Sequence, residues 1–412
     1  MDVFKLDPAA SDRIGEDAAL RARGPLTQVD ILGVQAWAVS NPQILKGLLN
    51  DKRVSKDPRQ HYPEFESVAA RWPLATWIVV QNMFTAFGAD HRKLRRLVAP
   101  AFSARRTAQM VPVIQEIAAG LLDAMEERAR RGETVDVRAE FAHKLPIQVI
   151  FRLMGLAPEW EAKLAGPVHN VFATMLPEDE QRANYQNLGQ LLSDFVAEKR
   201  ERPGDDLTGD LITASDEGTQ LSGHQLVDTL ILVISAGFET TVGLITNALH
   251  NLLTHPDELR TVRENPAEGW DAVVEETLRR DAPVAFLPLR YAVEDIDVAG
   301  VRIGKGEAIL AAYSAAGRDT SAHEKADTFD VRRPDKTHLS FGHGVHFCIG
   351  APLARAEGTI ALSAFFERFP DARLADEGAR PAPMESIISN SPRELRVRLL
   401  PSADRPRAGA LA

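Results

Sequence analysis

The stretch FGHGVHFCIG, residues 341–350, contains the only cysteine of a 412-residue chain and sets it among three glycines and two histidines. Glycines at this density mark backbone that turns tightly or approaches another group closely. Ala351 and Pro352 follow, and proline is favoured in the first turn of a helix, so we expect a helix to begin after Gly350. At a helix N-terminus, free N–H groups and the helix dipole lower a thiol pKa. The pattern favours a metal-binding or nucleophilic Cys348 over a small buried apolar residue.

The composition is that of an acidic globular protein. Hydrophobic residues make up 44% of the chain and charged residues 26%, which suits a sizeable core. The net charge of −10 argues against a nucleic-acid binder, because such proteins cancel phosphate charge with Lys and Arg. The most apolar stretch, 230–238, is much shorter than the roughly 20 residues that cross a bilayer, so no membrane partner is predicted. The N-terminus has no secretory pattern and a lone cysteine fits a reducing compartment, so we expect a cytoplasmic protein.

Helical periodicity dominates the chain, and strand-like runs are short. Apolar residues recur at three- and four-residue spacing over 110–131, which predicts an amphipathic helix. A surface loop is predicted over 201–210 from its Pro, Gly and Asp content. The strand candidates are 34–40, 295–303 with a turn at Gly300, and 307–313. The expected fold class is mainly α with small β sheets.

One helix is predicted to be much longer than the others. Ser222 followed by Gln225 matches a capping box and a proline after His255 marks the end, which gives a length of roughly 50 Å. So long and apolar a helix should be buried on most faces and form the spine of one large domain. Glu239 and Thr240 lie at its centre, where a buried carboxylate without a partner would be costly.

The pattern Phe, Gly, x, Gly, x, His, x, Cys, x, Gly resembles the heme-ligand loop of the cytochromes P450, and other motifs of that family follow in family order over nearly the whole chain. The resemblance implies the cytochrome P450 fold, with a long central helix over a buried heme, in a single domain over 1–404. The terminal residues 405–412 are expected to form a disordered tail. It implies heme b (iron protoporphyrin IX) as cofactor and Cys348 as the axial metal ligand. The matching positions are Phe341, Gly342, Gly344, His346, Cys348 and Gly350.

Four cationic residues resemble the family's partners of the heme propionates. His91 and Arg95 are four residues apart and share a helix face, Arg290 ends an apolar run, and His346 precedes Cys348 by two residues. Two carboxylates buried in protein need such partners. For each residue taken alone, a surface salt bridge is the alternative.

Glu276 and Arg279 resemble the family's Glu, x, x, Arg pair, which joins a later arginine, here Arg333, in a buried structural network. The spacing alone is weak evidence, because Glu127 and Arg130 share it on a helix that looks exposed. The position of Glu276, some seventy residues before Cys348, favours it.

The stretch AGFETT, 236–241, resembles the family's oxygen-activation segment. Ala236 and Gly237 are small enough to let the helix backbone pass close to the heme, and Glu239 and Thr240 would be the catalytic pair that holds an ordered water and relays protons. For the Thr240 hydroxyl, the alternative is a hydrogen bond to the carbonyl of the preceding turn.

The activity implied is monooxygenation, in which one oxygen atom of O2 enters a C–H bond. No flavin or nicotinamide fingerprint is evident, so the resemblance implies ferredoxin and ferredoxin reductase as partners. The basic stretch 91–106 could dock an acidic ferredoxin, and a solvated basic face is the alternative. The resemblance implies a mostly apolar pocket, which suits a bulky lipophilic substrate. The chain resembles the actinomycete subgroup associated with macrolide and steroid hydroxylation, which implies a steroid or macrolide-like compound. The predicted substrate-binding residues are Val233, Ala236, Val284, Leu287 and Ile388.

Two other functions stay open from the sequence. One is a heme-binding sensor or carrier without turnover, against which the Glu239 and Thr240 pair argues. The other is a cysteine hydrolase that uses Cys348 and His346, which are poorly spaced as nucleophile and base within a tight loop.

Overall fold

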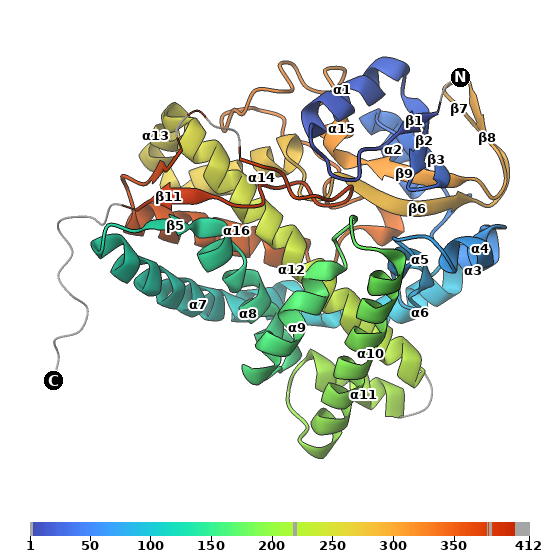
Figure 1. Cartoon of the computed structure of the whole chain (residues 1–412), viewed down its shortest axis with the longest axis horizontal. Coiled ribbons are helices and arrows are strands. Elements are labelled where there is room, and N and C mark those ends of the chain that lie inside the picture. The colour runs from blue at the N-terminus through green and yellow to red at the C-terminus, as the bar shows by residue number, and fades with distance from the viewer. Residues whose placement is uncertain (1–2, 217–220, 377, 379–380, 400–412) are drawn as a thin grey trace.

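A long helix crosses the middle of the molecule, with other helices packed around it and a sheet at one end (Figure 1). The computed structural model describes residues 3–216, 221–376, 378 and 381–399. The helices are α1 Arg13–Arg23, α2 Pro42–Asn50, α3 Pro58–His61, α4 Phe65–Ala69, α5 Thr76–Val79, α6 Gly88–Val98, α7 Ala104–Arg130, α8 Lys144–Met154, α9 Glu159–Asn170, α10 Glu178–Glu201, α11 Leu207–Asp216, α12 Gly223–Thr254, α13 Pro256–Glu264, α14 Pro266–Arg280, α15 Tyr313–Gly317 and α16 Ala351–Arg368. A π-helical turn, η2, spans Arg138–Ala142, and short 3-10 turns span Ala99–Phe102 (η1) and Gly344–His346 (η3).

The main sheet has six strands in the order β1-β2-β3-β9-β6-β4. β3 runs parallel to β9 and β6 runs antiparallel to it, which brings chain segments from both ends of the sequence together. The strands are β1 Phe4–Lys5, β2 Leu26–Ile31, β3 Val34–Val39, β4 Val54–Ser55, β6 Phe286–Ala292 and β9 Ala308–Ala312. A three-stranded sheet contains β10 Arg373–Leu374, β11 Arg396–Arg398 and β5 Thr134–Asp136, and β7 Ile296–Val298 pairs with β8 Val301–Ile303.

The central helix α12 begins at the predicted capping box. The Ser222 hydroxyl accepts a hydrogen bond from the Gln225 amide, and the Gln225 side chain accepts one from the Ser222 amide, each at 3.1 Å. The helix runs for 32 residues and contacts α8, α10, α14 and α16. Its composition would suit a membrane span, but 78% of its most apolar window is buried inside the protein, as expected of a core helix.

The three strand predictions are confirmed, and each predicted end lies within one residue of the observed one. Gly300 forms the turn between β7 and β8 with φ 77°. The predicted helix over 110–131 begins earlier, at Ala104, because the Ser103 hydroxyl caps it. The predicted loop over 201–210 is wrong in part. α11 starts at Leu207, where the buried Thr208 hydroxyl donates to the Met154 carbonyl at 2.7 Å.

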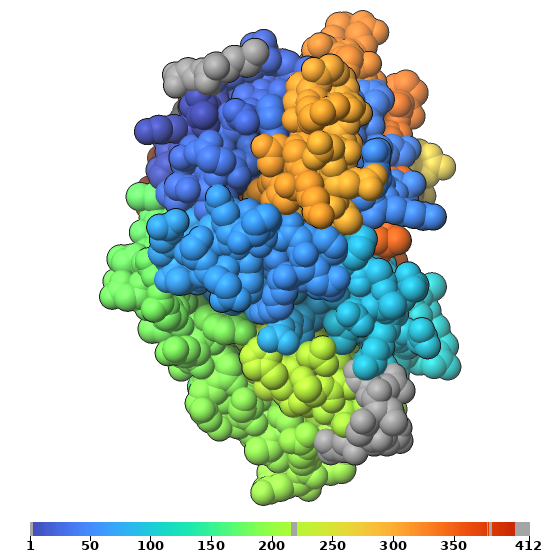
Figure 2. All heavy atoms as spheres, turned by 90° about the vertical axis from the view of Figure 1, so that its right-hand side faces the viewer, coloured from blue at the N-terminus to red at the C-terminus, as the bar shows by residue number. Residues whose placement is uncertain are grey.

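One large hydrophobic cluster contains residues from Leu6 to Leu399, and it surrounds α12. The predicted tail at 405–412 lies outside the described residues, and the single domain over 1–404 stays a prediction. Figure 2 shows the face where α3 to α5 (blue) lie between the β7–β8 hairpin (orange) and α10 with α11 (green). Helices α3 to α5 therefore form the surface between the sheet end and the helical end of the molecule on this face.

Candidate active site

The loop around Cys348 is shaped by glycines in conformations that other residues rarely adopt. Gly342 and Gly344 both have φ 70°, and a Cβ added to Gly344 would meet the Leu49 carbonyl oxygen of α2 at 2.7 Å. The Cys348 amide donates to the Phe341 carbonyl at 2.9 Å, which closes the loop. The loop is thereby fixed against α2 just before α16 begins.

The Cys348 side chain lies at the N-terminus of α16, as predicted. Burial raises the pKa of the Cys348 thiol, while hydrogen bonds from the Gly350 and Ala351 amides and the Arg95 charge lower it by less. Loss of hydration therefore opposes the predicted effect of the helix terminus on this thiol. The amides that would stabilise a thiolate are nevertheless in place.

A cavity lies between α12 and the cysteine loop. Cys348, Thr240 and Ala236 all line it, so the loop and the centre of the long helix meet there although they are more than a hundred positions apart. Phe341, Gly342 and Gly350 line it as well.

The four predicted cationic residues all line this cavity. The His91 and His346 rings lie 4.1 Å apart, and the Arg95 guanidinium donates to the Phe347 carbonyl at 2.7 Å. Burial lowers the pKa of His91 to about 4 and lowers that of His346 further, so both rings are neutral at pH 7. Within the part of the chain that the structure describes, His91 Nε2 and Arg290 Nη1 are buried without a hydrogen-bond partner. Buried donors without partners are costly, so this wall of the cavity fits a ligand that carries carboxylates.

Thr240 and Glu239 face different surroundings. The Thr240 hydroxyl lines the cavity and donates to the Ala236 carbonyl at 2.6 Å. Glu239 does not line it: its carboxylate is 1% exposed, forms a 2.8 Å salt bridge with Arg138 of η2 and lies 3.5 Å from His169 of α9. The prediction of one shared water site is therefore not met, because adjacent helix residues point about 100° apart and Arg138 holds Glu239 away.

Gly237 lines the cavity, as its predicted closeness to the heme requires, and it also packs against α8. A Cβ added there would meet the Ile150 side chain of α8 at 2.4 Å, so the glycine serves the close contact of α12 with α8. Ala236 lines the cavity beside it.

The predicted substrate residues divide into two groups. Val233, Ala236, Val284 and Leu287 line the cavity, together with Trp77, Val171 and Phe172. Ile388 does not. It is fully buried, and its carbonyl accepts a 2.7 Å hydrogen bond from the Ala285 amide, so it supports the lining from behind.

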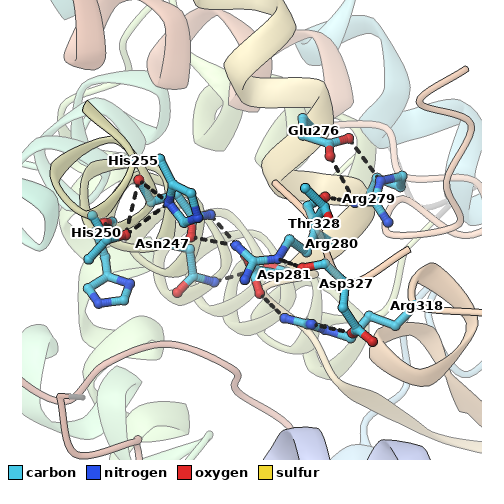
Figure 3. A network of polar contacts seen from close by, with 12 residues as sticks. Asn247, His250, His255, Glu276, Arg279, Arg280, Asp281, Arg318, Asp327 and Thr328 are labelled. Atoms are coloured by element: carbon cyan, nitrogen blue, oxygen red, sulfur yellow. Dashed lines mark hydrogen bonds and ion pairs between the residues drawn. The ribbon is translucent and has the colours of Figure 1, made fainter. Parts of the chain in front are cut away.

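Glu276 and Arg279 form a fully buried bidentate pair with two N–O distances of 2.8 Å, and Arg333 adds a 3.2 Å contact to the same carboxylate. Figure 3 shows the Glu276–Arg279 pair beside a second cluster, in which Asp281 lies 2.6 Å from Arg318. Arg279 also donates to the Gly317 and Ala326 carbonyls, so its charge is well satisfied. The cluster joins α14 to the segment that leads to the cysteine loop.

Sequence reasoning missed three charged residues of this region. Arg138 lies 101 positions from Glu239, and no local pattern links the two. Lys56 and Glu357 also line the cavity, and both are buried, but their sequence context is ordinary. Only the position of Glu357, nine residues after Cys348 on the helix expected there, could have indicated that it lies near the site.

The comparisons with known proteins agree with this geometry. The family model "Cytochrome P450" matches residues 14–155 and 270–397, so the chain belongs to the cytochrome P450 family. It is therefore a heme-iron-dependent oxidoreductase of the monooxygenase type.

Relatives from actinomycetes match over nearly the whole chain. 2-Hydroxy-5-methyl-1-naphthoate 7-hydroxylase of Streptomyces carzinostaticus is 40% identical over 413 residues, 99% of each chain. 6-Deoxyerythronolide B hydroxylase of Saccharopolyspora erythraea is 36% identical over 93% of this chain and 95% of the relative. The structure of CYP154A1 from Streptomyces coelicolor A3(2) is 52% identical with a TM-score of 0.94, over 97% of this chain and 100% of that one. The testosterone-bound CYP154C4 from Streptomyces sp. ATCC 11861 is 38% identical with a TM-score of 0.91, over 97% and 98%.

Proposed function

We propose that this P450 hydroxylates a bulky lipophilic compound, a steroid or a macrolide-like molecule, with electrons from a ferredoxin and its reductase in the cytoplasm. The observation that carries the proposal is that Cys348 and Thr240 line one mostly apolar cavity. An apolar lining suits a large lipophilic molecule because its burial there removes apolar surface from water. The named ligands of two relatives, a macrolactone and testosterone, belong to these classes.

When bound, the heme iron supplies the activation of O2 and the insertion of one oxygen atom into a C–H bond. The Cys348 thiolate would hold the iron from the α16 side, where the Gly350 and Ala351 amides can donate to it. The side chains of His91, Arg95, Arg290 and His346 would hold the two propionates, and the unpartnered His91 Nε2 and Arg290 Nη1 support that assignment.

Thr240 would handle protons on the substrate side. Since its hydroxyl hydrogen is engaged by the Ala236 carbonyl, its oxygen is left as an acceptor for a water molecule in the cavity. The carboxylate of Glu239 would take part only after it leaves Arg138, so in this arrangement Thr240 acts without it.

The ferredoxin would dock on the surface near the cysteine loop. Arg92, Lys93, Arg96 and Arg105 are exposed there, and Val345 and Phe347 of the loop are 64% and 40% exposed. Cations around an apolar centre fit an acidic electron carrier. Arg96→Glu should raise the KM for ferredoxin several-fold without changing substrate binding, whereas Arg260→Glu on α13 should leave KM unchanged.

An acidic polycycle is a second candidate substrate class. The relative from Streptomyces carzinostaticus is named for a naphthoate, an aromatic carboxylate, and Lys56 lies buried in the cavity of this chain.

The proposal is tested by titrating the heme-loaded protein with steroids, macrolactones and aromatic acids and following the spin shift of the heme. Compounds that shift it are then incubated with NADPH, ferredoxin and reductase, and products are identified by mass spectrometry. A hydroxylated steroid or macrolactone is the expected result. Spin shifts without any product would favour the sensor or carrier instead.

A further inference from the structure

Lys56 is a buried cation in the wall of the cavity. It directly follows β4, which pairs with Tyr291 and Ala292 of β6, and this pairing places it beside the strand that carries Arg290. Its residue exposure is 3%, and its side chain lines the same cavity as Cys348 and Thr240. Lysine is almost never buried so completely unless it is paired.

The contacts of Lys56 leave its charge incompletely satisfied. Its ammonium donates to the Pro288 carbonyl at 3.2 Å and lies 3.5 Å from the centre of the Phe84 ring. Among the residues that the structure describes, no carboxylate forms a salt bridge with it. Burial and the nearby Arg290 charge hold the pKa of Lys56 well below its ordinary value. An ammonium group can donate three hydrogen bonds, and the Pro288 carbonyl accepts only one of them, so at least one donor can still bind a ligand.

A second cation, Arg290, lies near Lys56. The charges of Lys56 and Arg290 act on each other and on the neutral His346 ring, and all three side chains line the cavity. Arg290 Nη1 has no hydrogen-bond partner among the described residues. Within the described lining, Glu357 is the one carboxyl residue, and burial raises its pKa well above the ordinary range, so it does not offset these cations.

We propose that Lys56 binds a carboxylate inside this cavity. The inference rests on the proposed function, since it takes the cavity to be the heme and substrate site. Two sources of a carboxylate fit: a heme propionate, toward Arg290 and His346, or an acid group on the substrate, toward Phe84. Either would form a charge-assisted hydrogen bond with Lys56 in a water-poor setting, where such bonds are strongest.

The test uses the heme-loaded protein and three variants. Lys56→Met keeps the length and removes the charge, Lys56→Arg keeps the charge, and Lys52→Met is a matched control on the exposed part of the same segment. Since replacing a buried charge by an apolar side chain is often neutral or stabilising, we expect Lys56→Met to fold, with a thermal midpoint no lower than that of the unchanged protein.

Two measurements distinguish the sources. If a propionate is the ligand, transfer of hemin to excess apomyoglobin should be about tenfold faster from Lys56→Met than from the unchanged protein, Lys56→Arg or Lys52→Met. If a substrate acid is the ligand, 1-naphthoate should bind more tightly than its methyl ester to the unchanged protein, and Lys56→Met should lose that preference by about tenfold.

Either result supports the proposal and identifies the source. A folded Lys56→Met protein with unchanged hemin transfer and an unchanged acid-to-ester ratio would overturn it. Failure of the proposed function would look different, because the unchanged protein itself would then lack the thiolate spectrum of the reduced carbon monoxide complex or any product with electrons supplied.

Discussion

Glu239 and Thr240 are consecutive in the central helix, yet their side chains serve different environments. The Glu239 carboxylate is buried 2.8 Å from the Arg138 guanidinium, while Thr240 lines the cavity and its hydroxyl donates to the Ala236 carbonyl. The sequence suggests that the two residues act together in catalysis. In this arrangement Glu239 forms a buried structural salt bridge, and only Thr240 lies at the cavity. The distinction can be measured on each residue separately.

Removing the Glu239 charge should lower the stability of the protein and have little effect on the coupling of NADPH consumption to product. Glu239→Gln leaves Arg138 buried without its partner, which typically costs about 3–5 kcal/mol in the free energy of unfolding. The double variant Glu239→Leu with Arg138→Met should recover much of that loss, because no buried charge remains. Urea unfolding measures both. A stable Glu239→Gln protein with impaired coupling of NADPH to product would instead assign Glu239 to proton transfer.

Thr240→Ala should keep heme and substrate binding but divert reducing equivalents to hydrogen peroxide. The variant removes the oxygen that can hold a water in the cavity, so protons arrive less effectively at the reacting centre. Thr240→Ser should restore most of the coupling. Thr246→Ala is the matched control, since Thr246 makes the same kind of bond, to the Val242 carbonyl at 2.7 Å, away from the cavity lining. Peroxide and product are quantified against NADPH consumed, and full coupling in Thr240→Ala would place the proton route elsewhere.

Cys348→Ala should abolish the thiolate-type absorption spectrum of the reduced carbon monoxide complex. No other cysteine exists in the chain that could replace the ligand. Heme can still enter the apolar cavity of the variant, so absorption in the heme region alone does not decide the matter. A retained thiolate spectrum would contradict the assignment of the axial ligand.

The Glu276–Arg279–Arg333 network should be far more important to stability than another pair of the same spacing. Glu276→Gln leaves two buried guanidinium groups with reduced pairing, and we expect a loss of about 3–5 kcal/mol. Glu127→Gln breaks the exposed pair with Arg130, which also has i, i+3 spacing, and should cost less than about 1 kcal/mol. Thermal and urea unfolding measure both variants. Equal losses of stability in Glu276→Gln and Glu127→Gln would show that burial of the pair does not determine its contribution.

His143 should make stability depend on pH in mildly acidic solution. Burial lowers the pKa of His143 to about 4, against the attraction of Glu239, whereas an unfolded histidine titrates near 6.5. The unfolded chain therefore binds the extra proton between about pH 6.5 and 4, and stability falls as the pH falls through that window. His143→Gln should reduce this fall by about 1–2 kcal/mol, after allowance for partial exposure of the ring. Parallel pH profiles of unfolding in the two proteins would rule out this contribution.

Local sequence patterns determined much of this protein. The capping box at Ser222 and the proline after His255 set the limits of α12, because caps depend on neighbouring residues alone. The glycines before Cys348 and the helix start after Gly350 likewise follow from backbone conformation, and their pattern in the sequence is enough to indicate the cysteine site.

Only the tertiary structure decided how distant charges pair. Arg138 reaches Glu239 across 101 positions, Lys56 enters the cavity beside Arg290, and Ile388 stands behind the lining rather than in it. The direction of the Cys348 pKa was also set by burial, which opposes the helix terminus that the sequence revealed. Local conformation depends on neighbours in the chain, but hydration and electrostatic pairing depend on everything that folds around a group.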